Sequence, residues 1–454
     1  MSWTQADDHW TRPFNCDDRL LHAIGALGAP FGRDNMLMMI SAQLESLTGV
    51  DAEGRLREAW KAMRFNHPDI ALQIHATENL KRYYPVRDEK DLEAWCNESF
   101  RIEKTARSSD EFFSRHHPLP GRYASLYWFP TSNQVALTAE HVRWDGRGSV
   151  LLLHELLSEL ENPTPLPTVF DGTEAQNLVP ALDVVVGMPE KYEEKWVQRA
   201  DELRFKLLDG QPSIGLQPPG NQSALPGDTI RTELVVPAKE AIALRAAARA
   251  QGISMTAALH TSAVIETARA NPDSPAKRFV SLAPYDVRKY CPEPFNGPRH
   301  AASVRVTALP LNVDARASWP DLAPVIFKIY RETWDMDKSD MMFVRVPYIE
   351  KGRALFEPMP PGTPRPPPAT EPNVNSLGVL DDYVRHQYSD FVVKNIFFTF
   401  YMLSQQLYIH CWSWRGDLHI SASYNESYYT PEYVAKYLKA LKDNMVENLI
   451  DNTT

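Results

Sequence analysis

Nine prolines fall between residues 161 and 226 and separate two stretches of chain that each carry their own strand and helix patterns. Proline lacks a backbone N–H and clashes inside a helix, so this segment cannot form a long buried strand or one continuous helix. A charged stretch near Glu193–Leu208 is the regular element that its pattern supports. We interpret residues 166–226 as a crossover linker between an N-terminal lobe, 1–165, and a C-terminal lobe, 227–454.

The length of 454 residues allows two or three domains, and 43% hydrophobic and 23% charged residues are typical of a globular protein. The formal charge of −10 argues against a general nucleic-acid binder, which needs a basic face. The longest nearly apolar runs, such as Met36–Ala42 and Ile396–Leu403, are far shorter than the ~20 residues of a membrane span. We therefore expect a monomer that binds neither nucleic acid nor a membrane.

The cysteines and the N-terminus indicate a reducing compartment. Four cysteines lie far apart, without a C-x-x-C pair, as expected for reduced thiols: Cys16, Cys96, Cys291 and Cys411. The first eight residues are polar and acidic and do not resemble a signal peptide. The adjacent histidines His116 and His117 have no matching Cys or carboxylate spacing, so we expect no metal site. The predicted location is the cytoplasm.

The sequence of the N-terminal lobe predicts a mixed α/β unit. Met36–Ile40 is an apolar run of strand length, and Asp51 is a plausible N-cap of a helix that should stop before Pro68. Tyr123–Phe129 and Gln134–Ala139 are aromatic and β-branched runs with the spacing of a hairpin. A leucine-rich helix should follow, with Ser149 as its cap.

The C-terminal lobe repeats a strand–helix pattern. The predicted elements are a strand at Thr229–Val236, a helix at Lys239–Ala250 stopped by Gly252, a helix capped by Ser254, a strand at Asp417–Tyr424 and a helix at Thr430–Leu449. The proline-rich segment Pro358–Pro372 is expected to be a rigid surface loop. Both lobes therefore belong to the α/β class.

The run His141-Val142-Arg143-Trp144-Asp145-Gly146 lies on the loop between the second hairpin strand and the leucine-rich helix. An imidazole at a strand end can take a proton from an attacking hydroxyl or amine. Asp145 more plausibly holds the loop by hydrogen bonds or an ion pair, and Gly146 would allow a backbone geometry that a Cβ forbids. On spacing alone, a buried structural histidine is the commoner outcome.

Five segments in chain order resemble the CoA-dependent acyltransferase superfamily, which includes plant BAHD acyltransferases, condensation domains of nonribosomal peptide synthetases and fungal trichothecene 15-O-acetyltransferases. The first four are Phe65–Ile70, the H-x-x-x-D-G run, Gly252–His260 and the D-x-R of Asp286–Arg288. The fifth is Asn375-Ser376-Leu377-Gly378. The resemblance covers nearly the whole chain, and the fungal branch is the most similar.

This resemblance implies an α/β fold of mixed sheets, with two chloramphenicol-acetyltransferase-like lobes in a V and a channel between them. It implies that His141 is the base, with Asp145 in the catalytic motif and paired with Arg288. Trp144 would line the channel, and Asn375, Ser376 and Gly378 are candidates for stabilising the oxyanion. Acyl-CoA, acetyl-CoA above all, would be a co-substrate with no bound cofactor, and an alcohol or amine the acceptor.

The sequence departs in two places from the motifs of particular branches of this superfamily. Glu140 stands where condensation domains carry a further histidine, and the D-F-G-W-G motif of plant enzymes is missing, with Ser413–Asp417 as a poor analogue. Three functions stay open: an acyl-CoA-dependent O-acyltransferase, a free-standing condensation-like enzyme with a carrier-bound donor, and a cyclase or binding protein on the same fold. Activity with free acetyl-CoA against a carrier-loaded donor discriminates among them.

Overall fold

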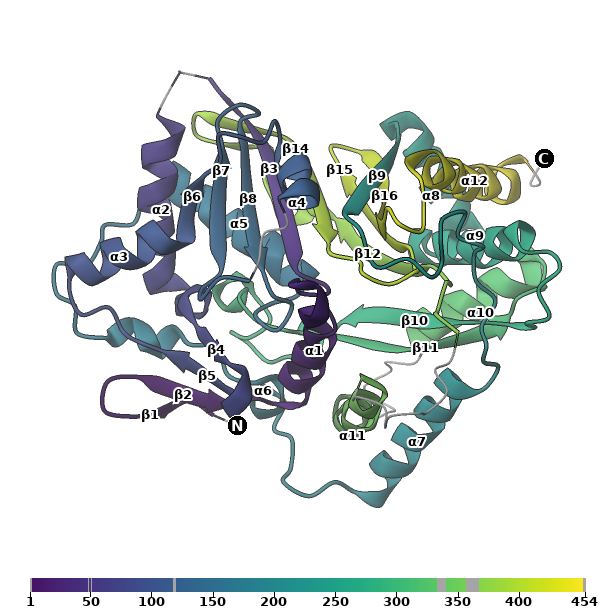
Figure 1. Cartoon of the computed structure of the whole chain (residues 1–454), viewed down its shortest axis with the longest axis horizontal. Coiled ribbons are helices and arrows are strands. Elements are labelled where there is room, and N and C mark those ends of the chain that lie inside the picture. The colour runs from purple at the N-terminus through teal and green to yellow at the C-terminus, as the bar shows by residue number, and fades with distance from the viewer. Residues whose placement is uncertain are drawn as a thin grey trace. The chain divides into compact units, whose positions relative to one another are not determined.

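The computed structural model describes residues 2–47, 49, 51–116, 120–332, 340–356 and 367–451. The chain forms two compact units (Figure 1). The first unit comprises Met1–Pro189, Asp286–Val306 and Leu380–Phe400, and the second comprises Glu190–Tyr285, Thr307–Val379 and Tyr401–Thr454. His117 and residues 357–366 of the predicted proline-rich loop lie outside the described residues.

A six-stranded mixed sheet organises the first unit, in the order β13-β14-β3-β8-β7-β6. The strands are β3 (Met38–Ser46), β6 (Phe100–Ile102), β7 (Ser125–Phe129), β8 (Gln134–Ala139), β13 (Gln387–Tyr388) and β14 (Phe391–Phe400). Only the β6–β7 pair is parallel within this sheet. The predicted hairpin is therefore confirmed as β7 and β8, at the centre of a sheet that also recruits β14 from late in the chain.

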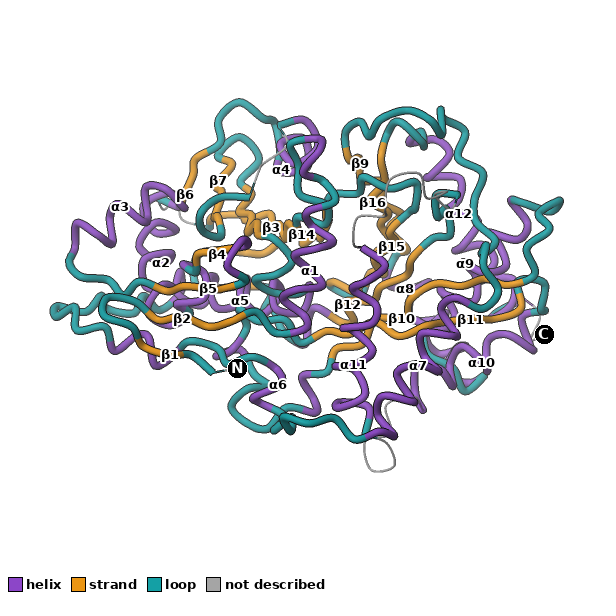
Figure 2. The backbone as a smooth tube through the Cα atoms, turned by 60° about the horizontal axis from the view of Figure 1, so that its bottom comes forward, coloured by secondary structure: helices purple, strands orange, loops and turns teal. Residues whose placement is uncertain are grey.

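Helices and a small antiparallel sheet complete the first unit. The helices are α1 (Cys16–Ala26), α2 (Ala52–Asn66), α3 (Glu89–Ser99), α4 (Ser109–Arg115), α5 (Gly146–Glu161) and α6 (Leu182–Val185). The small sheet has the order β1-β2-β5-β4, with β1 (Thr4–Gln5), β2 (Trp10–Pro13), β4 (Gln73–His75) and β5 (Leu80–Tyr83) (Figure 2). Helix α2 begins after the N-cap Asp51, whose side chain accepts from the Gly54 N–H, and ends before Pro68, as predicted.

The second unit is built on the mixed sheet β12-β15-β16-β9, in which only β12 and β15 are parallel. Its strands are β9 (Thr229–Val236), β12 (Asn373–Val379), β15 (Tyr408–Trp414) and β16 (Asp417–Asn425), and a separate ladder pairs β10 (Arg278–Asp286) with β11 (Val306–Asp314). The helices are α7 (Glu194–Leu208), α8 (Ala238–Ala250), α9 (Met255–Ala270), α10 (Trp319–Glu332), α11 (Met341–Arg353) and α12 (Pro431–Leu449). The predicted Ser254 cap and Gly252 stop are confirmed, the latter with a φ of 74°.

The two units do not follow the contiguous ranges drawn from the sequence. The hairpin β7–β8 and the strand β9 lie in different units, as predicted. Two later segments, 286–306 and 380–400, nevertheless belong to the first unit, because β14 pairs along the whole of β3. Within the expected crossover, α6 lies in the first unit and α7 in the second.

Candidate active site

The H-x-x-x-D-G loop joins β8 to α5 in the first unit (Figure 1). The N-cap of α5 is Asp145, whose carboxylate accepts from the Gly148 N–H at 2.7 Å. The prediction of Ser149 as the cap is therefore wrong; its hydroxyl lies in the first turn and donates to the Gly146 carbonyl at 2.7 Å. An aspartate satisfies the first helical N–H groups as well as a serine does, and it adds a charge that suits the helix dipole.

His141 is part-buried on this loop, and a single contact sets its tautomer. Its Nδ1 lies 3.1 Å from the Trp144 carbonyl oxygen. A carbonyl oxygen can only accept, so Nδ1 carries the hydrogen and Nε2 of the neutral ring keeps its lone pair. Burial lowers the pKa of His141 below its ordinary 6.5, although the Asp145 carboxylate opposes this effect. At neutral pH the ring is therefore uncharged, with Nε2 ready to accept a proton.

Asp145 is the hub of the loop, and 2% of it is exposed. Besides capping α5, its Oδ2 accepts from the Arg305 backbone N–H at 2.6 Å and from Arg288 Nη1 at 3.0 Å. Arg288 Nη2 lies 2.9 Å from Oδ1, so the ion pair is bidentate. The predicted contact is confirmed, but both residues belong to the first unit and not to different lobes.

The charge on Asp145 is fixed. Burial opposes ionisation, but the Arg288 guanidinium and the hydrogen bonds from Gly148 and Arg305 hold the pKa of Asp145 below its usual range. A carboxylate with these donors around both oxygens is a poor proton carrier. The geometry therefore gives Asp145 a structural role in shaping the loop.

The close approach that only glycine permits occurs at Gly148. A Cβ at this position would lie 2.5 Å from the Ala301 carbonyl oxygen and 3.1 Å from Arg288 Nη2. Gly146, which was predicted to need such freedom, is the first residue of α5. The G-x-G spacing was visible in the sequence, but the segment that approaches Gly148 comes from more than 150 residues later.

Two buried cations that the sequence did not single out hold the loop backbone. Lys81 on β5 donates to the Val142 carbonyl at 2.6 Å and pairs with Asp18 at 2.6 Å. Arg143 donates to the Leu72 carbonyl at 2.6 Å and pairs with Glu140, the residue before His141. Because both side chains are almost fully buried, these contacts are shielded from water and fix the position of the loop.

The residues predicted to line the channel or to stabilise the oxyanion lie in two different places. The Trp144 side chain is 1% exposed, and its backbone carbonyl is the part that contacts His141. Asn375, Ser376 and Gly378 lie on β12 in the second unit. Asn375 pairs with His410 and Ser376 with Cys411, so these neighbours face opposite sides of the sheet. Gly378, with a φ of 75°, follows an irregularity in the ladder. An oxyanion role for this segment stays a prediction.

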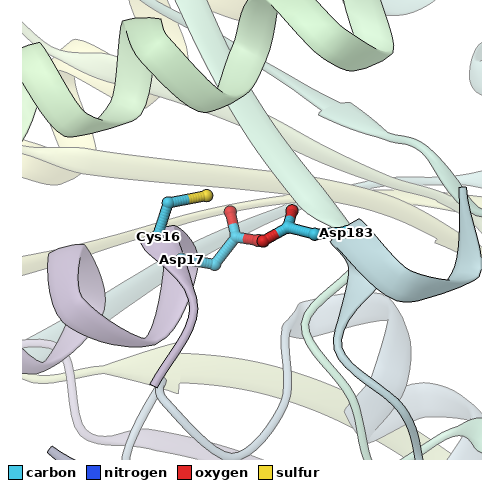
Figure 3. Close-up of side chains that lie close together, drawn as sticks. All are labelled: Cys16, Asp17 and Asp183. Carbon is cyan, nitrogen blue, oxygen red and sulfur yellow. The ribbon is translucent and has the colours of Figure 1, made fainter. Parts of the chain in front are cut away.

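Among the described residues, one group of three could offer metal ligands: Cys16, Asp17 and Asp183 (Figure 3). Their donor atoms lie within 4.8 Å of one another. Asp17 already accepts a hydrogen bond from Asn15 at 3.2 Å and acts electrostatically on the buried Arg305 guanidinium. We assign no metal to this group. All four cysteines are buried thiols.

Comparisons with known proteins agree with this fold. No family model matches the sequence. The chain is 26% identical over 462 residues to acetyltransferase pigO of Monascus ruber, covering 99% of this chain and 98% of that protein. It is also 26% identical over 452 residues to O-acetyltransferase pigM of the same organism, covering 97% and 86% of the two chains.

Solved structures show the same fold. The TRI3 trichothecene 15-O-acetyltransferase from Fusarium sporotrichioides superposes with a TM-score of 0.81 at 16% identity, over 98% of this chain and 97% of that one. The first condensation domain of the calcium-dependent antibiotic synthetase gives 0.66 at 14% identity, over 97% and 96%. The chain therefore has the fold of this trichothecene 15-O-acetyltransferase and of condensation domains, and with two acetyltransferases similar to it over nearly its whole length, it is an acyltransferase.

Proposed function

We propose that this chain transfers an acyl group, acetyl in the first place, from acyl-CoA to a hydroxyl of a bulky secondary metabolite, with His141 as the general base. The observation that carries the proposal is the hydrogen bond from His141 Nδ1 to the Trp144 carbonyl. It leaves Nε2 as the proton acceptor, and the lowered pKa keeps the ring neutral at physiological pH.

The chemistry needs one proton acceptor and no metal. Nε2 takes the proton of the acceptor hydroxyl as its oxygen attacks the thioester carbonyl, which gives a tetrahedral oxyanion. Collapse of that intermediate breaks the carbon–sulfur bond, and the imidazolium returns its proton to the departing thiolate. Asp145 and Arg288 keep the loop in place throughout and exchange no proton.

The substrate class is supported by similarity. Two relatives that match nearly the whole chain are named acetyltransferases, one of them an O-acetyltransferase, and the most similar fold described above belongs to an enzyme that acetylates a trichothecene. Eleven tryptophans among 454 residues suit a bulky apolar acceptor. A carrier-bound acyl donor is the alternative, because condensation domains share the fold.

The test is acetyl transfer from acetyl-CoA to a panel of hydroxylated terpenoids and polyketides, read by mass. His141→Ala should lower turnover roughly 10²–10⁴-fold, the range for loss of a general base, with little change in donor binding. His154→Ala is the matched control: this part-buried histidine of α5 bonds to the Tyr388 hydroxyl at 2.7 Å and lies outside the loop. It should retain turnover.

A parallel assay with a carrier-loaded acetyl group decides the donor. Transfer from acetyl-CoA supports the proposal. Transfer only from the carrier would show that the acyl donor is carrier-bound, and His141 would remain the proposed base. Wild-type-like turnover in His141→Ala with either donor would defeat the mechanism.

A further inference from the structure

The four-stranded sheet of the second unit has two unlike faces. Positions such as Val374, Ile409 and Ile420 belong to the hydrophobic core that includes residues of α8, α9 and α12. Apart from Val235, the alternate positions of β9, β15 and β16 are polar or aromatic, and they include Glu233, Trp412, His419 and Ser421. The ladder places His419 beside Trp412, and Ser421 beside Glu233. A polar strip therefore crosses three strands of this sheet.

A carboxylate–imidazole pair lies in this strip. His419 Nδ1 is 2.6 Å from Glu233 Oε1, and the two side chains are 6% and 15% exposed. The second oxygen of Glu233 pairs with Arg231 Nη1 at 2.6 Å. Although burial opposes the charge, the hydrogen bond from His419 and the Arg231 guanidinium hold the pKa of Glu233 below its usual range. An ionised carboxylate only accepts, so Nδ1 carries the hydrogen and Nε2 is the ring nitrogen left for another partner.

The ring of His419 is also held from the side. It stacks on Trp412, with ring centroids 5.2 Å apart and an angle of 6° between the planes. The carboxylate fixes which nitrogen is protonated, and the indole fixes the plane of the ring. This is the arrangement that orients an imidazole toward a reacting or bound group.

Among the residues that the structure describes, three polar atoms of the strip nevertheless have no hydrogen-bond partner: His419 Nε2, the Trp412 indole Nε1 and Ser421 Oγ. The three residues are 5%, 1% and 0% exposed. Buried polar groups are nearly always paired, and each exception calls for an explanation. Three on neighbouring strand positions are best explained by a polar partner from outside the chain.

We propose that His419, Trp412 and Ser421 form a binding subsite for an uncharged polar group of a substrate, a hydroxyl or a secondary amide. Such a group can both donate and accept, so it can pair with His419 Nε2 while it accepts from the Trp412 indole or the Ser421 hydroxyl. A carboxylate or phosphate fits poorly, because the Glu233 carboxylate lies next to the ring and repels a second anion. An ammonium group also fits poorly beside Arg231.

The strip ends at β9, the edge strand of this sheet. Val235 on β9, which lies opposite His419 in the ladder, is 46% exposed. The polar atoms are therefore one strand away from a solvent-exposed apolar side chain. This combination suits a mostly apolar molecule that carries a hydroxyl or amide.

The inference rests on the proposed acyl transfer, in which both the acyl donor and the acceptor can carry such a group. The acetyl transfer assay separates the two sources, because the KM of each substrate is measured in turn. His419→Phe keeps the stack on Trp412 and removes Nε2, so the KM of one substrate should rise about 2- to 10-fold, the value of one hydrogen bond. The kcat should change little, because no chemistry is assigned to His419.

His260→Phe is the matched control. This histidine of α9 is also fully buried, but both nitrogens are paired, with the Tyr330 hydroxyl at 3.0 Å and Ser281 Oγ at 3.1 Å. Its loss should lower the unfolding midpoint and leave both KM values unchanged. Glu233→Gln is the milder second variant: it can reverse the tautomer of His419 and should raise the same KM.

A readout without turnover keeps this inference distinct from the proposed function. In protein labelled with ¹⁵N-histidine, the Nε2 signal absent from His419→Phe should move when CoA, as the donor probe, or a terpenoid alcohol, as the acceptor probe, is added. Movement with one probe identifies the source even if no transfer is detected. Unchanged KM values, or a signal that neither probe moves, would show that only water occupies the strip and would overturn the proposal.

Discussion

The immediate surroundings of two titratable side chains on one loop keep one of them neutral and the other ionised. His141 is neutral because burial penalises the imidazolium, and its Nδ1 hydrogen is used by the Trp144 carbonyl. Asp145, four residues later, is ionised because Arg288 and two backbone N–H groups surround it. The same loop therefore presents a proton acceptor that stands ready and a carboxylate that cannot take the proton.

The lowered pKa of His141 gives a pH dependence with a definite sign. Only the neutral ring can act as base, so kcat/KM should fall with decreasing pH once the ring becomes protonated. Because burial puts that pKa below the ordinary 6.5, the acid limb of the profile should have an apparent pKa below 6.5. Measuring kcat/KM for acetyl transfer from about pH 5 to pH 9 checks this. A midpoint above 6.5 would contradict the assignment of His141 as a buried neutral base.

The Asp145–Arg288 pair predicts a large loss of stability. Asp145→Ala leaves the Arg288 guanidinium, 5% exposed, without its buried partner and removes the cap of α5. Breaking a buried pair from one side typically costs about 3–5 kcal/mol, so the free energy of unfolding should fall by that amount in urea denaturation. Asp286→Ala is the control, because this second partner of Arg288, at 3.2 Å, has a side chain that is 38% exposed. It should cost about 1 kcal/mol or less; equal losses would refute the hub role of Asp145.

At the scale of elements, the loop between β8 and α5 is held by a strand of the other sheet of the first unit. Lys81 on β5 spans from the Val142 carbonyl to Asp18, and Asp18 also pairs with Arg12 at 3.1 Å. These groups are nearly excluded from water, so the network is strong only while every member is present. It places the backbone on which His141 stands.

Lys81→Met should therefore lower kcat more than it changes either KM, by about 10-fold, because a small displacement of a base is costly. Lys81→Arg should recover part of the loss. The matched control is Lys61→Met, since Lys61 on α2 is also buried and pairs with Glu58 at 2.8 Å and with Glu93, away from the loop. It should destabilise the fold without changing kcat. If both variants lower kcat equally, Lys81 contributes stability and no positioning.

Local signals predicted the elements well, whereas of the long-range contacts of the loop only the Asp145–Arg288 pair was predicted, and that from the family resemblance. Asp51, Pro68, Gly252 and Ser254 act on their own helix ends, so their effect is visible within a few residues. The Ser149 cap was wrong because Asp145 lies one turn earlier and competes for the same N–H groups. Lys81 contacts a residue 61 positions away, and Arg305 one 160 positions away, so only the tertiary structure reveals them.

No described helix meets the length and hydropathy needed to cross a membrane.

At the scale of the whole molecule, the chain returns twice to its first unit. The ranges 1–165 and 227–454 treated each lobe as continuous, because the sequence carries no mark of strand pairing. Residues 286–306 supply Arg288 and Arg305 to the loop, and residues 380–400 supply β14 to the sheet. Folding of the first unit therefore depends on contacts that are distant in the chain, which is expected to slow it.

This interleaving predicts how fragments behave. A fragment of residues 1–189 lacks β14, so β3 would become an edge strand, and buried contacts such as those of Phe398 and Phe400 would be lost. Exposed edges of this kind aggregate, and Asp145 would have no buried cation. The fragment alone should show no cooperative unfolding transition by circular dichroism. Co-expression with residues 190–454, which contain both missing segments, should give a complex that co-purifies and regains His141-dependent activity. A cooperative transition in the isolated fragment would show that the first unit folds without the two later segments.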